Sequence, residues 1–153
     1  MKSKLTLSFL LVFSLFVSVN AQSERDNVKA VIDALFDGMR AKNSEQIMGA
    51  FSENAIMQTI QNKPEGTFIA INSVSDFAKN IGSIPADRQL DERLTDYVIN
   101  IDANMATAWT PYQFFVNDKF SHCGVNSFQL VKFDDDWKIV YIIDTRRTEA
   151  CVE

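Results

Sequence analysis

The chain is poor in the residues that build metal and nucleophilic sites. It has one histidine, His122, and two cysteines, Cys123 and Cys151. These three side chains cannot complete a four-ligand zinc site without carboxylates. His122 and Cys123 are also neighbours, and neighbouring residues of a strand point to opposite faces. We therefore expect neither a metal site nor cysteine-based catalysis.

Clustered positive charge is missing as well. The 15 lysines and arginines are outnumbered by 20 aspartates and glutamates, for a net charge of −5, and no basic stripe runs along the chain. Binding to a phosphate backbone depends on such clusters. The sequence also contains no phosphate-binding loop, dinucleotide fingerprint or paired-cysteine motif. We expect no nucleic-acid partner and no cofactor.

The one long apolar run is too short for a typical transmembrane helix. It covers residues 5–19, against the roughly 20 apolar residues that a bilayer-spanning helix needs. Lys2 and Lys4 precede it, and small residues lead to a cleavage site after Ala21. This order predicts a signal peptide over residues 1–21, with an uncleaved membrane anchor as the alternative.

The residue directly after the predicted cleavage site is Gln22 rather than a cysteine, so a lipoprotein is not expected. Residues 22–153 would then form one domain with 13 basic and 20 acidic residues, a net charge of −7. We expect a secreted or periplasmic protein with no stable membrane insertion after signal cleavage. In such a compartment Cys123 and Cys151 either form a disulfide or remain two unpaired thiols.

Helical patterns come first in this domain. Ser23 with Asp26 forms a capping-box pattern, and apolar residues at helical spacing follow from Val28 to Met39. A second short helix is predicted around residues 47–51 and a third over residues 74–81. Between them we expect a short strand at 55–60 and a turn at 62–66.

The spacing of apolar residues changes to two from Asp91 onward. Turn-forming residues divide this part into four predicted strands, at residues 93–101, 106–116, 122–133 and 137–147. Helices followed by a meander of strands indicate an α+β fold, with the helices packed on one face of a curved antiparallel sheet.

The C-terminal strands also carry a family resemblance. The run from Ser121 to Lys132 (SHCGVNSFQLVK) and the ending with Trp137-Lys138-Ile139 and Asp144-Thr145-Arg146-Arg147 resemble the nuclear transport factor two-like superfamily. Within it, the small exported SnoaL-like and lumazine-binding proteins are most similar. The resemblance implies a cone-shaped domain, a cystatin-like roll, with a pocket between three helices and the sheet. It also implies a homodimer formed through the outer face of the sheet.

The predicted register of the last three strands determines which residues reach that pocket. A two-residue turn at Asp135-Asp136 places Gln129 opposite Ile142 and Ser127 opposite Asp144. The predicted pocket face then carries the following residues: Ala108, Thr110, Tyr112, Ser127, Gln129, Ile142, Asp144 and Arg146. The opposite face would carry an apolar stripe that suits a dimer interface: Trp109, Phe115, Phe128, Leu130, Ile139, Tyr141 and Ile143.

Five polar side chains are therefore the candidate ligand-binding residues: Tyr112, Ser127, Gln129, Asp144 and Arg146. Asp144 and Arg146 lie two apart on a strand and can pair. Such a pair either orients a ligand or closes the rim of the cone as a structural ion pair. In an alternative register, shifted by one residue, His122 and Asn126 would join Asp144 and favour acid–base chemistry. Asp91, Glu92 and their charged neighbours are interpreted as a solvated face.

Comparison with ketosteroid isomerases, which share the fold, argues against catalysis of that type. A gapless count puts Leu35, Thr59 and Gln129 at the three positions that act in those enzymes. Proton abstraction needs a base within reach of the substrate, and Thr59 cannot serve as one at neutral pH.

Three functions remain open. The first, which we favour, is an exported, non-catalytic domain that binds a small hydrophobic or mixed-polarity molecule. The second is an enzyme of the SnoaL-like type, a lyase, cyclase or hydrolase that uses Asp144. The third is a dimeric interaction module with a filled pocket.

Overall fold

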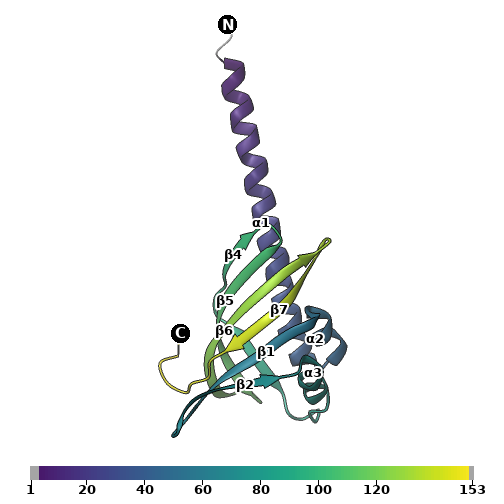
Figure 1. The fold of residues 1–153 in the computed structure, drawn as a ribbon, viewed down its shortest axis with the longest axis vertical. Coiled ribbons are helices and arrows are strands. Elements are labelled where there is room, and N and C mark those ends of the chain that lie inside the picture. The colour runs from purple at the N-terminus through teal and green to yellow at the C-terminus, as the bar shows by residue number, and fades with distance from the viewer. Residues whose placement is uncertain (1–3, 152–153) are drawn as a thin grey trace.

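The computed structural model describes residues 4–151, with side chains from residue 22 onward. Three helices and seven strands follow one another in the chain (Figure 1). Their bounds are α1 Lys4–Ala41, α2 Ser44–Ala50, β1 Phe51–Lys63, β2 Gly66–Asn72, α3 Val74–Gly82, β3 Leu90–Leu94, β4 Val98–Asp102, β5 Met105–Val116, β6 Lys119–Phe133 and β7 Asp136–Asp144. No helix whose side chains are described is long and apolar enough to cross a membrane.

Helix α1 contains the predicted apolar stripe but begins far upstream of Ser23. Val28, Ile32 and Leu35 of this stripe are buried against the sheet. The helix is continuous through Ser23, so the expected capping box does not start it. The expected signal peptide, residues 1–21, and its cleavage site lie outside the residues whose side chains are described.

The two short helices begin at capped ends. Asn43 accepts a hydrogen bond from the backbone N–H of Gln46 at 3.1 Å, which starts α2. Ser73 does the same for Asp76 at 3.3 Å, which starts α3. These caps direct α2 and α3 to the C-terminal end of α1, where they close one end of the curved sheet (Figure 1).

The sheet follows the order β2-β1-β7-β6-β5-β3, and β4 pairs with β5 beside β3. The pairings are antiparallel except for β1 with β7, which is parallel. The α+β class and the curved sheet closed by three helices are confirmed. Three details differ from the sequence prediction. The sheet is mixed rather than antiparallel, because β1 and β7 run parallel. Residues 66–72 form an additional strand, and the predicted strand at 93–101 is two strands. Asp96 interrupts it, because its side chain accepts the backbone N–H of Tyr97 at 2.8 Å.

Two β-bulges change the predicted register of β6. The β5–β6 pairing shifts between Phe114 and Phe115, where the partner strand skips Ser121. The β6–β7 pairing shifts between Gln129 and Leu130, where the partner strand skips Val140. A shift of one residue turns every following side chain to the other face. The strand β6 is therefore inverted relative to the prediction, and so is Ile139 of β7, which precedes the bulge at Val140. The strand β5 and the end of β7 from Tyr141 to Asp144 keep their predicted faces.

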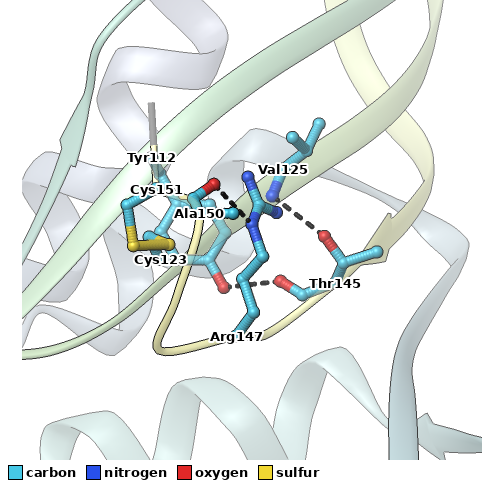
Figure 2. Close-up of a disulfide and its surroundings, with 7 residues drawn as sticks. All are labelled: Tyr112, Cys123, Val125, Thr145, Arg147, Ala150 and Cys151. Carbon is cyan, nitrogen blue, oxygen red and sulfur yellow. Dashed lines mark hydrogen bonds between the residues drawn. A yellow bond between two sulfur atoms is a disulfide. The ribbon is translucent and has the colours of Figure 1, made fainter. Parts of the chain in front are cut away.

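A disulfide joins β6 to the C-terminal segment. Cys123 bonds to Cys151, and the backbone of Cys123 pairs in both directions with that of Arg147, at 2.8 and 2.9 Å. Figure 2 shows this bridge together with Thr145, whose side-chain hydroxyl accepts a hydrogen bond from the backbone N–H of Val125 at 3.1 Å. Of the two alternatives for the cysteines, the structure has the bridge. It holds the chain after β7 against the strand that carries His122 and Gly124.

Candidate functional site

A cavity of about 220 Å³ lies between the helices and the concave face of the sheet. Its walls come from α1, α3 and six strands. Most of them are apolar: Leu35, Phe36, Met39, Met57, Phe77, Ile81, Leu90, Phe114 and Ile142. Polar side chains also reach it, among them Glu92, Tyr112, His122, Asn126, Asp144 and Arg146. The pocket is therefore open rather than filled, and its lining is of mixed polarity.

The polar end is built around Asp144, the last residue of β7. Asp144 is buried and accepts a hydrogen bond from Nε of Arg146 at 2.9 Å. The guanidinium side chain of Arg146 is 56% exposed, so the pair bridges the cavity and its rim. A carboxylate held in this way is a fixed acceptor for a ligand.

Tyr112 is placed by the absence of a side chain at Gly124. The two residues are directly opposed on β5 and β6. A Cβ at Gly124 would lie 1.8 Å from the backbone oxygen of Thr145 and 2.8 Å from the Tyr112 ring. Because that space is free, the Tyr112 hydroxyl donates to the oxygen of Thr145 at 2.9 Å. Burial and the nearby carboxylates of Glu92 and Asp144 raise the pKa of Tyr112, which stays a neutral donor.

Glu92 reaches the cavity from β3. Its carboxylate accepts a hydrogen bond from the side-chain amide of Asn126 at 2.7 Å. Burial raises the pKa of Glu92 to about 7, and the Asp144 carboxylate adds to this rise, while Asn126 and Arg146 oppose it. Glu92 is therefore present in both protonation states near neutral pH.

His122 lies on the same face, at the start of the regular part of β6. Its ring is tilted by 31° against Phe114 with 4.9 Å between ring centres, and its Nδ1 lies 3.1 Å from the hydroxyl of Ser121. Burial lowers the pKa of His122, and the positive charge of Arg146 lowers it further, against the opposing effect of Asp144. The imidazole is therefore neutral at pH 7 and contributes no positive charge to the cavity.

Two further hollows adjoin the cavity. One lies between the β1–β2 hairpin and α3 and shares Thr59, Asn72, Phe77 and Arg146 with it. The other shares Phe36 and Glu92. Thr59, at the position of the isomerase base, and Leu35, at that of the isomerase tyrosine, both line the cavity.

The structure brings together residues from both registers considered for the sequence. Tyr112, Asp144 and Arg146 line the cavity, as the first register predicted. His122 and Asn126, which only the alternative register placed there, line it as well. The placement of Ser127 and Gln129 is wrong. They alternate with Asn126 and Phe128 and face the convex side, because the two bulges invert β6. Gln129 is thereby also removed from the isomerase-like position that a gapless count gave it.

The interpretation of Glu92 as part of a solvated face is wrong too. Its neighbour Asp91 does lie at the surface side of β3, where it pairs with Arg40 and Arg93. The sequence could have predicted the inward position of Glu92 from Leu90 and Leu94. These apolar residues lie two positions before and after it, and residues two apart on a strand share a face. An acidic residue between two inward apolar residues reaches the same interior as they do.

A curved sheet closed by three helices over a cavity is the cystatin-like fold of nuclear transport factor two-like proteins. A family model described as "Putative lumazine-binding" matches residues 23–142. The chain belongs to this family, which confirms the resemblance seen in the sequence. No curated protein sequence matches the chain.

Solved structures show the same fold at low identity. A nuclear transport factor two-like protein of Novosphingobium aromaticivorans is 13% identical with a TM-score of 0.70, over 89% of this chain and 90% of that chain. A "putative scytalone dehydratase" of the same organism is 13% identical with a TM-score of 0.69, over 89% and 93%. A Mycobacterium tuberculosis protein of unknown function is 14% identical with a TM-score of 0.69, over 85% and 75%. At these identities the likeness is one of fold.

Proposed function

We propose that this protein is an exported domain that binds one small molecule of mixed polarity in the cavity and does not transform it. The observation that carries the proposal is the convergence of polar side chains at one end of a largely apolar cavity. Ligand sites in proteins combine apolar walls with a few placed polar groups in this way. The family description points in the same direction.

The size of the cavity restricts the ligand. At about 220 Å³ it is smaller than the roughly 300–1,000 Å³ of sites for drug-sized compounds. We therefore expect a compact molecule, with lumazine, a bicyclic nitrogen heterocycle, as one candidate to test because of the family description.

Native mass spectrometry of protein purified from the cell envelope or medium tests the binding proposal. We expect a co-purified small molecule, with Asp144→Asn losing several-fold in affinity for it. Gln129→Ala is the matched control, since this side chain lies on the convex face and should leave binding unchanged. Equal losses in both variants, or binding unaffected by Asp144→Asn, would contradict a site at this cavity.

N-terminal sequencing of the same material tests export. Cleavage after Ala21 gives a chain beginning at Gln22, in cyclised or open form. An intact Met1 in the membrane fraction would instead indicate an anchored protein.

Acid–base catalysis is the second candidate, favoured by Glu92. Its pKa of about 7 suits a group that gives and takes protons at neutral pH, and it lies at the same polar end as Asp144. Incubating the co-purified compound with excess protein and following its NMR spectrum separates the candidates. An unchanged spectrum supports binding alone, whereas conversion that is lost in Glu92→Gln supports the enzyme.

A further inference from the structure

The charges at the polar end of the cavity do not balance. Two carboxylates, Glu92 and Asp144, face a single guanidinium, Arg146, whose side chain extends to the solvent. His122 adds no charge at pH 7 because its pKa is lowered by burial. With both acids ionised, this end of the cavity carries a net negative charge.

Each of the two acids also keeps an oxygen available. Glu92 uses Oε1 to accept from Asn126, and Asp144 uses Oδ2 to accept from Arg146 and, at 3.5 Å, from Tyr112. Among the described residues, no hydrogen bond reaches the second oxygen of either carboxylate. Two acceptors without donors line one end of the same cavity.

The Asp144 carboxylate disfavours the ionised form of Glu92, which is one reason, after burial, why the pKa of Glu92 is raised. A positive charge between them would remove that penalty and supply the missing donors. An anionic ligand would add a third negative charge to the same space. The charges at this end of the cavity therefore favour a cation over an anion.

We infer that the ligand of this cavity is a small apolar molecule that ends in a protonated amine, and that the amine lies between the carboxylates of Glu92 and Asp144. This inference rests on the proposed binding function and adds the chemical class of the ligand. The ammonium group donates up to three hydrogen bonds, which matches two free carboxylate oxygens. The apolar body packs on Leu35, Met39 and Ile81.

Three probes of nearly equal size and different charge test the inference. They are 2-phenylethylamine, 2-phenylethanol and phenylacetate, titrated into the full mature chain at pH 8 and followed by NMR or calorimetry. We expect the amine to bind at least ten-fold more tightly than the alcohol and the acid to bind most weakly. The preference for the amine should shrink several-fold at pH 5.5, where Glu92 is protonated.

Glu92→Gln and Asp144→Asn identify the groups responsible. Each should reduce the preference for the amine by about ten-fold while changing the affinity for the alcohol little, because shape is conserved and one charge is lost. Glu53→Gln, which removes the same charge from an exposed position on β1, is the control and should retain the full preference.

The outcomes separate the ligand class from the binding function. Binding of the alcohol as tightly as the amine overturns the inference and leaves a neutral-ligand site. Tighter binding of phenylacetate also overturns it and makes Arg146 the anchor. If none of the probes binds at millimolar concentration while a neutral or acidic compound co-purifies, the ligand class is wrong and the binding function stands. If nothing binds and nothing co-purifies, both fail.

Discussion

Single residues set the electrostatics of this cavity, and Glu92 is the most informative of them. The ordinary pKa of glutamate is 4.5, whereas folding raises that of Glu92 to about 7. Between these values the folded protein holds a proton that the unfolded chain has released. Stability therefore falls as pH rises from about 4.5 to about 7, because the folded state must then bury the charge.

Glu92→Gln should remove this dependence. We expect the variant to be more stable than the natural chain by about 2 kcal/mol at pH 8, a value reduced for the partial exposure of the group, and nearly equal to it at pH 4.5. Urea unfolding at both pH values measures the difference, with Glu53→Gln as the surface control. A Glu92→Gln variant that is less stable at pH 8 would mean that the charge is stabilised in the folded state.

Gly124 is a residue whose identity is required by close contacts with its neighbours. An alanine there collides with the backbone at Thr145 and with Tyr112, so Gly124→Ala should destabilise the domain by about 1–3 kcal/mol. Gly49→Ala is the matched control, because a Cβ on this helical glycine meets nothing within 4 Å. That variant should gain stability by about 0.5–1 kcal/mol. Thermal unfolding of both variants checks that the first loses stability and the second gains it, relative to the natural chain.

At the scale of elements, the turns and bulges of the sheet determine the site. Helix periodicity, the order of helices and strands, and the inward faces of β5 and of the end of β7 could all be read from the sequence, because each depends on local spacing of apolar residues. The inversion of β6 could not. Ser121 and Val140 look like ordinary strand residues, and a bulge becomes visible only where two strands are paired.

The C-terminal segment depends on its covalent link to β6. The bridge between Cys123 and Cys151 spans 28 residues, a loop whose closure stabilises a fold by about 3–4 kcal/mol. Cys151→Ser should lower the free energy of unfolding by that amount in denaturant titrations. Adding a thiol reductant to the natural chain should bring it to the same midpoint, and the variant itself should not respond. A natural chain that is insensitive to reductant would show that the bridge contributes little.

At the scale of the whole molecule, the convex face of the sheet differs from the one predicted. Phe128, Leu130 and Ile139 of the expected dimer stripe are buried in the core, because the bulges turn them inward. The convex face instead has one row of directly opposed residues across six strands: Ile71, Gln58, Ile143, Ser127, Trp109 and Val98. Ile71 is 73% exposed, Trp109 53% and Val98 51%.

Such an exposed apolar row continues to favour a homodimer through this face. We predict that the natural chain is a dimer at tens of micromolar and that Trp109→Glu converts it to a monomer, measured by light scattering over a range of concentrations. Met48→Glu, at an equally exposed site on α2, should leave the dimer intact. A concentration-independent monomer of the natural chain would contradict the prediction.

The sequence by itself determined the α+β class, the family and three of the cavity's polar residues, Tyr112, Asp144 and Arg146. These follow from local periodicity and from a short run of residues typical of the family. Only the tertiary structure decided that Glu92, His122 and Asn126 meet Asp144 in one cavity, while Ser127 and Gln129 face away. The reason is physical: a side chain's face depends on strand pairing between segments far apart in the chain, and one skipped residue reverses it.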